Sequence, residues 1–225
     1  RQRNVQAYQN FDGRITAKDL LKKSFTKEEV NVLDFWSAKP LRERFIQGNQ
    51  DEYNVAIGPA IKSVANFFKK LWDGEELPVN YACRSNLMQG DLVWRNINDG
   101  LEWNVFSDFK AYDSHQEVPL LKFEGRMYDY VLEPFPGKRK VMDWINKQLV
   151  THGIITCRET DGVIEYWGEG RRASGMPNTS WGNTWNNLFA QLTVMTHGSS
   201  IEKVKEWIKN KSFCLHLLGD DMWCQ

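Results

Sequence analysis

The feature that most constrains the fold is an apolar segment near the C-terminus that leads into two adjacent aspartates. Residues 213–217 alternate in the period of a β-strand, and Gly219-Asp220-Asp221 follows directly before another apolar run. Two like charges side by side repel each other, and a simple turn could use Asn-Gly or Asp-Gly instead. The segment therefore predicts a hairpin. Its double Asp is either an ordinary polar turn or part of a site that shares a cation with other carboxylates.

Helices are predicted in four other segments by the spacing of apolar residues or by helix-boundary residues. They are 59–72, 140–152, 178–197 and 199–210. Gly74, Gly153 and Gly198 are the stop signals of the first three, and Ser199 with Glu202 matches a capping box that opens the fourth. The apolar face expected for the first helix consists of Ile61, Val64, Ala65, Phe68, Leu71 and Trp72.

Strand signals occur in two further places. Residues 101–107 alternate apolar and polar side chains and lead to Asp108. Residues 154–157 and 163–167 flank Asp161-Gly162, a pair typical of a hairpin turn. The order of strand, helix-rich insertion, long helix, short helix and hairpin predicts an α+β fold.

Chain length and net charge limit the number of domains and the kinds of partner that the sequence allows. The 225 residues suffice for one large domain or two small ones, and 29 basic side chains balance 29 acidic ones. Because these charges balance, the protein as a whole has no net electrostatic attraction to nucleic acid or lipid. An anionic partner must therefore be held by a local basic cluster. The four cysteines lack zinc-binding spacing, and no apolar run reaches membrane-spanning length. Because the sequence begins at Arg1 and stops soon after the double Asp, we expect a fragment of a longer protein.

Carboxylates that could share a cation with the double Asp occur where the predicted strand ends. Asp108 lies at that point, and "DFKAYD" puts Asp113 five residues later. Two or three carboxylates could hold a pair of Mg²⁺ ions about 3.5–4 Å apart, the arrangement used for in-line phosphoryl transfer. By spacing alone, unrelated surface carboxylates are the better interpretation.

A third element adds to this pattern. "GRRASGMPNTSWGN" contains Ser174-Gly175, Thr179 and Asn183. Glycine and proline in a polar loop that opens a helix suit a substrate-facing loop, with Asn183 about two turns into the helix. The alternative is an ordinary capped helix start, with Ser, Thr and Asn in their usual places.

The ordered set "DFKAYD", "SGMPNTSWGN" and "GDD" resembles the three central palm motifs of viral RNA-dependent RNA polymerases. The tail "YDSHQ" resembles the tombusvirus-like and nodavirus-like branch of positive-strand RNA viruses. Upstream, "RERFIQGNQDEYNVAIGPAIK" is similar to a stretch in the fingers of that branch. The resemblance covers the chain from about residue 27 to its end.

This resemblance implies a right-hand polymerase palm, a ferredoxin-like antiparallel sheet with helices, together with fingers elements. Residues 1–100 would be fingers elements that include the basic nucleotide-entry region. Residues 101–225 would be palm, with a fingers insertion at about 117–170. The end of the palm and the thumb would be absent, so we expect the fragment alone to bind divalent metal weakly and to polymerise poorly.

The resemblance also implies the chemistry, which is RNA-templated RNA synthesis from nucleoside triphosphates. Asp108, Asp220 and Asp221 would be the catalytic residues and would ligate Mg²⁺, for which Mn²⁺ can substitute. The main-chain carbonyl of Phe109 would complete one coordination sphere. The partners would be template and nascent RNA, with no membrane segment in this stretch, and the location would be host cytoplasm at membrane-associated replication sites.

The substrate contacts implied by the resemblance fall into three groups. Asp113 and Asn183 would read the ribose 2′-hydroxyl. The mobile loop that positions nucleotide and template would contain Ser174, Gly175 and Thr179, and the triphosphate would be held by Arg44, Arg42 and Lys39. Arg171 and Arg172 would either contact template phosphates or belong to a solvated loop.

Three other classes stay open. A non-catalytic RNA-binding or scaffold protein would bind RNA regardless of Asp220. A carbohydrate-active enzyme would be metal-independent, with two carboxylates roughly 5–9 Å apart. A reverse transcriptase would share the double Asp but would usually lack the ribose-reading pair, so deoxynucleotide use would distinguish it.

Overall fold

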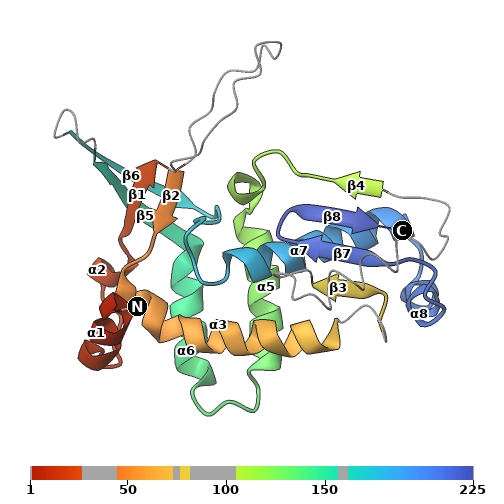
Figure 1. The fold of residues 1–225 in the computed structure, drawn as a ribbon, viewed down its shortest axis with the longest axis horizontal. Helices are drawn as coiled ribbons and strands as arrows, with labels where there is room; N and C mark the ends of the chain where they lie inside the picture. Colours follow the sequence, from red (N-terminus) through yellow and green to blue (C-terminus); the bar gives the residue numbers. More distant parts are fainter. Residues whose placement is uncertain (1, 27–44, 73–76, 82–104, 157–161, 225) are drawn as a thin grey trace, which may run out of the picture.

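The computed structural model describes residues 2–26, 45–72, 77–81, 105–156 and 162–224, which form two four-stranded sheets and a group of helices. Figure 1 shows the two sheets on opposite sides of the molecule, with helices between and beneath them. The mixture of separate sheets and helices confirms the predicted α+β class.

The first sheet joins the N-terminal part of the chain to the middle. Its strands are β1 (Lys22–Thr26), β2 (Phe45–Gly48), β5 (Val150–Thr156) and β6 (Val163–Glu169), in the order β2-β1-β5-β6. β5 and β6 form the predicted antiparallel hairpin, whose turn includes residues outside the described ones. β1 runs parallel to β5.

The second sheet carries the double Asp. Its strands are β3 (Val79–Tyr81), β4 (Val105–Ser107), β7 (Leu215–Leu218) and β8 (Asp221–Cys224), in the order β3-β7-β8-β4. The predicted C-terminal hairpin is confirmed, and so is the strand leading to Asp108 over residues 105–107. Residues 101–104 of that predicted strand lie outside the described residues. The expected purely antiparallel sheet is wrong, because β3 joins β7 in parallel.

The helices of the described residues are α1 (Gln2–Asn10), α2 (Ala17–Leu20), α3 (Asp51–Leu71), α5 (Val118–Val131), α6 (Lys138–Asn146), α7 (Thr179–Thr196) and α8 (Ile201–Lys209), with the short 3₁₀ helices η1 (Tyr112–His115) and η2 (Lys147–Leu149). No helix in the described part of the chain combines the length and apolar character needed to cross a bilayer.

Helix α3 begins earlier than predicted. It starts at Asp51, and Pro59 lies inside it on the exposed side. Acidic residues in the first turn favour this start because the N-terminus of a helix carries partial positive charge. The predicted apolar face is confirmed at Ile61, Val64, Phe68 and Trp72, whereas Leu71 is 42% exposed.

Aromatic packing holds α3 against α7. The Phe68 ring stacks on Trp181 with centroids 4.8 Å apart, and Trp72 stacks on Trp185 at 5.9 Å. Trp181 is fully buried. These tryptophans are therefore core residues that fix α7, the helix on which the candidate site is built.

Two predicted helix boundaries are wrong, and a third differs by one residue. The helix predicted to reach Gly153 ends at Asn146, and Gly153 instead lies in β5 opposite Tyr166, whose ring occupies the space of a side chain. The cap of α8 is Ser200, which accepts from the Lys203 N–H, rather than Ser199. The long helix ends at Thr196, one residue before the predicted end, where His197 and Gly198 both have positive φ, +41° and +77°.

Candidate active site

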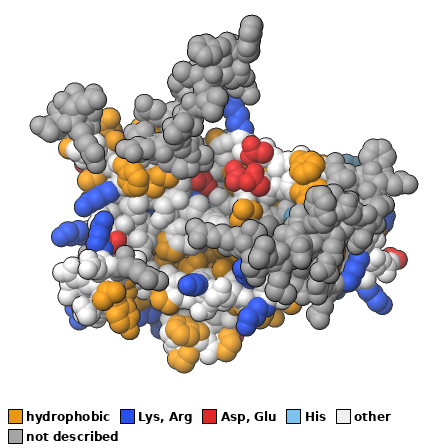
Figure 2. Space-filling model, in the orientation of Figure 1, with side chains coloured by type: hydrophobic (Ala, Val, Ile, Leu, Met, Phe, Trp, Pro, Cys, Tyr) orange, Lys and Arg blue, Asp and Glu red, His pale blue; other side chains and the backbone are white. Residues whose placement is uncertain are grey.

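The strand pairing brings Asp108 and Asp221 to one edge of the second sheet. Ser107, the last residue of β4, pairs with Met222 of β8, so Asp108 follows at the level where β8 begins with Asp221. Both aspartates line the same pocket. Figure 2 shows acidic side chains gathered in the region where Figure 1 has the β7–β8 turn and the segment after β4.

The turn itself has a two-residue loop. Leu218 pairs with Asp221, which leaves Gly219 and Asp220 at the tip. Gly219 has φ +66°, a conformation that favours glycine at the first position of such turns. Asp220 is thereby held at the tip of the hairpin and Asp221 at the start of its second strand.

The negative charges of the other two aspartates affect the ionisation of Asp221. The pKa of Asp221 is raised, first by partial burial and then by the negative charges of Asp220 and Asp108. Each added negative charge makes it harder to ionise the next carboxyl group. A cation among them would relieve this repulsion.

The donor set fits Mg²⁺, which prefers oxygen ligands. Among the residues that the structure describes, no three or more Asp, Glu, His or Cys side chains form a group that could hold a metal ion. Mg²⁺ usually keeps several waters and binds one or two carboxylates plus substrate phosphates, so a closed protein cage is not required. Asp108, Asp220 and Asp221 are the residues that would hold it.

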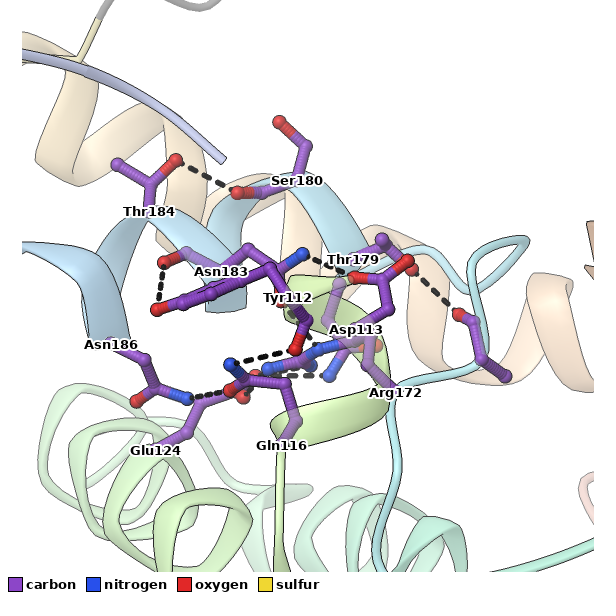
Figure 3. A network of polar contacts seen from close by, with 12 residues as sticks. Tyr112, Asp113, Gln116, Glu124, Arg172, Thr179, Ser180, Asn183, Thr184 and Asn186 are labelled. Carbon is purple, nitrogen blue, oxygen red and sulfur yellow. Dashed lines mark hydrogen bonds and ion pairs between the residues drawn. The ribbon is translucent and has the colours of Figure 1, made fainter. Parts of the chain in front are cut away.

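The two residues expected to read the ribose lie in direct contact. Asn183 of α7 donates from Nδ2 to Asp113 Oδ1 over 2.6 Å (Figure 3). Asp113 belongs to η1, and its neighbour Tyr112 donates to the Asn183 carbonyl at 3.4 Å. Burial of Asn183 excludes most of the water that would compete for these bonds.

A buried ion pair lies beneath this contact. Arg172 binds Glu124 of α5 through its terminal nitrogens and donates from Nε to Asn183 Oδ1 at 2.9 Å (Figure 3). Both side chains of the ion pair are almost completely buried. Burial alone would lower the pKa of Arg172, but the Glu124 carboxylate outweighs it and raises that pKa. Neither role expected for Arg172 is correct: it is neither solvated nor open to template phosphates.

Arg172 also sets the direction of the Asn183 amide. Because a guanidinium only donates, it selects the oxygen end of the amide and turns the nitrogen toward Asp113. Glu124 accepts a further bond from Asn178 Nδ2 at 2.9 Å, and Gly182 leaves the space that its carboxylate fills. Arg171, in contrast, is exposed and donates to the Ser114 carbonyl.

The loop before α7 is attached to β2. Ser174 Oγ donates to the Phe45 carbonyl at 3.2 Å, and Gly175 forms a parallel bridge with Gly48. A Cβ on Gly175 would lie 2.6 Å from the Gln47 carbonyl oxygen, so only glycine fits this approach. Thr179 Oγ1 donates back to the Ala173 carbonyl at 2.8 Å. Lys39, Arg42 and Arg44 lie outside the described residues.

The sequence motifs did not identify the polar residues of α5 and α7 that support the site. Glu124, Thr184, Asn187 and Gln191 were not expected to take part. A signal was present, because the buried side of α7 carries Asn, Thr and Gln where a packed helix usually carries apolar residues. Buried amides and hydroxyls need partners, and here the partners are the segments that carry the aspartates.

The fold and site are those of an α+β domain with carboxylates gathered at a sheet edge, beside an amide–carboxylate pair. The family described as viral RNA dependent RNA polymerase matches residues 104–214. The chain is 29% identical over 178 residues to the RNA-directed RNA polymerase of Carnation mottle virus, covering 77% of this chain and 22% of that protein. It is 27% identical over 178 residues to that of Turnip crinkle virus, covering 76% and 21%.

A third relative, the RNA-directed RNA polymerase of Oat chlorotic stunt virus, is 29% identical over 168 residues, covering 71% of this chain and 21% of that protein. The chain is thus similar to the viral RNA-directed RNA polymerases over most of its length, and the resemblance inferred from its motifs is confirmed. It spans about a fifth of the length of these curated relatives.

Proposed function

We propose that the chain carries the catalytic carboxylates and the ribose-reading pair of an RNA-dependent RNA polymerase that copies viral RNA. The observation that carries this proposal is the convergence of segments far apart in sequence. Asp108 and Asp221 line one pocket, while Asn183 binds Asp113 five residues beyond Asp108. A polar turn or a set of scattered surface carboxylates would have no reason to converge in this way.

In the proposed mechanism Asp108 and Asp220 would ligate the metal ions, and Asp221 would be an outer or alternate ligand. The main-chain carbonyl of Phe109 would add one oxygen donor. Bound Mg²⁺ would supply activation of the primer 3′-hydroxyl and neutralisation of the leaving pyrophosphate. The contribution of the chain is to hold negatively charged oxygens at a fixed sheet edge, where β4 and β8 pair.

Selection of the sugar is assigned to Asp113 and Asn183. A ribose 2′-hydroxyl can both donate and accept, which suits a carboxylate next to an amide. Arg172 would keep the amide in one orientation, so that the pair is preorganised before the nucleotide arrives. A deoxyribose would leave these polar groups without their partner, and such loss is strongly disfavoured in a buried site.

The remaining assignments extend the same proposal. Ser174, Gly175 and Thr179 position nucleotide and template, while Lys39, Arg42 and Arg44 hold the triphosphate. We also propose residues 1–100 as fingers elements and 101–225 as palm, with the insertion at about 117–170 in the fingers. The pairing of β1 and β2 with β5 and β6 supports that grouping. Template and nascent RNA would be the partners, at membrane-associated sites in the host cytoplasm.

The proposal is tested by primer extension with the full product of the gene that encodes this chain. Asp220→Asn should abolish extension, whereas Glu206→Gln, a substitution on exposed α8, should leave it unchanged. Asp113→Ala should lower the preference for ribonucleotides over deoxynucleotides by at least about tenfold. Extension that survives Asp220→Asn would contradict the proposal. RNA binding without extension in the unsubstituted protein would favour a scaffold, and preferred use of deoxynucleotides would favour a reverse transcriptase.

A further inference from the structure

One face of α7 carries three polar side chains that are buried against the Asp-bearing sheet. Thr184, Asn187 and Gln191 follow one another at intervals of three and four residues, so they lie on the same side of the helix. Thr184 and Asn187 are completely buried, and Gln191 is 9% exposed. Burial of a hydroxyl and two amides costs free energy unless each is hydrogen-bonded.

Thr184 and Asn187 bind the backbone of the hairpin turn. Thr184 Oγ1 accepts from the Gly219 N–H at 2.8 Å and donates to the Ser180 carbonyl at 2.8 Å. Asn187 Nδ2 lies 3.1 Å from the Gly219 carbonyl and 3.0 Å from that of Asp220. It also lies 3.4 Å from the carbonyl of Asp221. All three residues of the Gly-Asp-Asp turn are therefore attached to α7.

Gln191 extends this attachment to the other strand. Its Nε2 donates to Ser107 Oγ at 3.1 Å and lies 3.1 Å from Asn187 Oδ1. Ser107 immediately precedes Asp108 at the end of β4. One continuous set of hydrogen bonds thus connects the backbone of the turn, through Asn187 and Gln191, to the residue next to Asp108.

We propose that Thr184, Asn187 and Gln191 are positioning residues that hold Asp108 and the Asp220-Asp221 pair at the separation required for a shared divalent cation. This inference rests on the proposed function, because it assigns the cation to that site. The physical reason is that three carboxylates gathered at one edge repel one another. Backbone held by buried hydrogen bonds resists the resulting displacement, whereas a free hairpin tip would relax away from Asp108.

A packing role and a positioning role predict different results. If Thr184 only fills space, then Thr184→Val, which keeps the shape and removes both hydrogen bonds, should leave cation binding unchanged. If Thr184 positions the turn, Thr184→Val should weaken cation binding and Thr184→Ser, which keeps the hydroxyl, should restore it. Thr193→Val is the matched control, because exposed Thr193 makes the same backward bond within α7, to the Phe189 carbonyl, at 2.7 Å.

The experiment is a titration of Mn²⁺ followed by electron paramagnetic resonance, using the full product of the gene that encodes this chain. Partners of metal ligands typically contribute about 10- to 100-fold to metal affinity, so Thr184→Val should weaken Mn²⁺ binding by that factor. Thr184→Ser and Thr193→Val should stay within about twofold of the unsubstituted protein. Circular dichroism identifies the variants that fold.

Ser107→Ala keeps the inference testable if Thr184→Val does not fold, since it removes the link to Gln191 from the half-buried strand side. It should weaken Mn²⁺ binding several-fold. Unchanged affinity in a folded Thr184→Val protein would overturn the inference, as would unchanged affinity in Ser107→Ala where Thr184→Val is unfolded. An unsubstituted protein that neither binds Mn²⁺ nor extends a primer would instead overturn the proposed function.

Discussion

The amide of Asn183 donates to the carboxylate of Asp113 at 2.6 Å across seventy positions of sequence, and its oxygen accepts from Arg172 at 2.9 Å. The same amide is thus bound at both ends. Because Arg172 is paired with Glu124, the orientation of Asn183 depends on a buried charge pair. The Arg172 backbone N–H also donates to the Asp113 carbonyl at 2.8 Å. Stability and sugar selection are therefore expected to be linked through Arg172.

Replacement of Arg172 alone should be costly. Arg172→Met leaves the Glu124 carboxylate buried without its counter-charge, and broken buried pairs of this kind cost about 3–5 kcal/mol. The double variant Arg172→Met, Glu124→Leu should recover much of that loss, because no buried charge remains. Chemical denaturation of Arg172→Met, Glu124→Leu, the double variant and the unsubstituted chain completes a double-mutant cycle. Equal losses in the single and double variants would show that the ion pair is not the source of the effect.

Alanine substitutions at two helical glycines should distinguish a steric requirement for glycine at position 182 from the ordinary effect of helix propensity. In Gly182→Ala the new methyl group would overlap the Glu124 carboxylate, so we expect a loss of about 1–3 kcal/mol in the free energy of unfolding. Gly58→Ala is the matched control, because Gly58 also lies inside a helix but has open space around its Cα. That change should be neutral or stabilising by up to about 1 kcal/mol. Thermal or chemical unfolding measures both, and similar effects would contradict the steric account.

Acid should destabilise the chain through His216. Burial lowers the pKa of His216 to about 4, and the Asn80 amide nitrogen lies 3.3 Å from its Nδ1. The unfolded chain then binds a proton at higher pH than the folded chain does. The contribution of neutral His216 to the free energy of unfolding is therefore fully present above the ordinary pKa near 6.5. It declines by about 2–3 kcal/mol as the pH falls from 6.5 toward 4.

The check on this prediction is denaturation at pH 7.0, 5.5 and 4.0 for the unsubstituted chain and for His216→Gln. Carboxylates that titrate in the same range act in both proteins, so the difference between the two pH profiles isolates the histidine. Parallel profiles would show that His216 contributes nothing to acid sensitivity.

The tryptophans should divide into core and surface residues. Trp181 is buried between α3 and α7, where Trp181→Ala should cost about 3–5 kcal/mol because it leaves a large cavity. Trp167 is 65% exposed on β6, where Trp167→Ala should change stability by about 0.5 kcal/mol or less. Unfolding monitored by far-ultraviolet circular dichroism compares them. A small loss at Trp181 would mean that α7 is held mainly by its polar contacts.

Local patterns in the sequence predicted the elements that depend on nearby residues. The hairpin around Gly219 follows from strand period and turn chemistry, and the long helix from 178 to 197 follows from its cap and its stop signal. Within the site, Asp108 at a strand end and Asn183 within the helix were predicted by motif order. These features are local because backbone conformation and amphipathic period are set over a few residues.

The tertiary structure decided the features that depend on residues distant in sequence. No local sequence pattern predicts the ion pair between Glu124 and Arg172 or the parallel pairing of β3 with β7. The same is true of the position of Gly153 opposite Tyr166. The support of the double Asp by Asn187 is of the same kind, since a polar residue in a helix is equally compatible with solvent until the sheet covers it. The sequence specifies which side chains can ionise or donate, whereas packing specifies which of them are buried together, and burial makes those contacts strong enough to position a site.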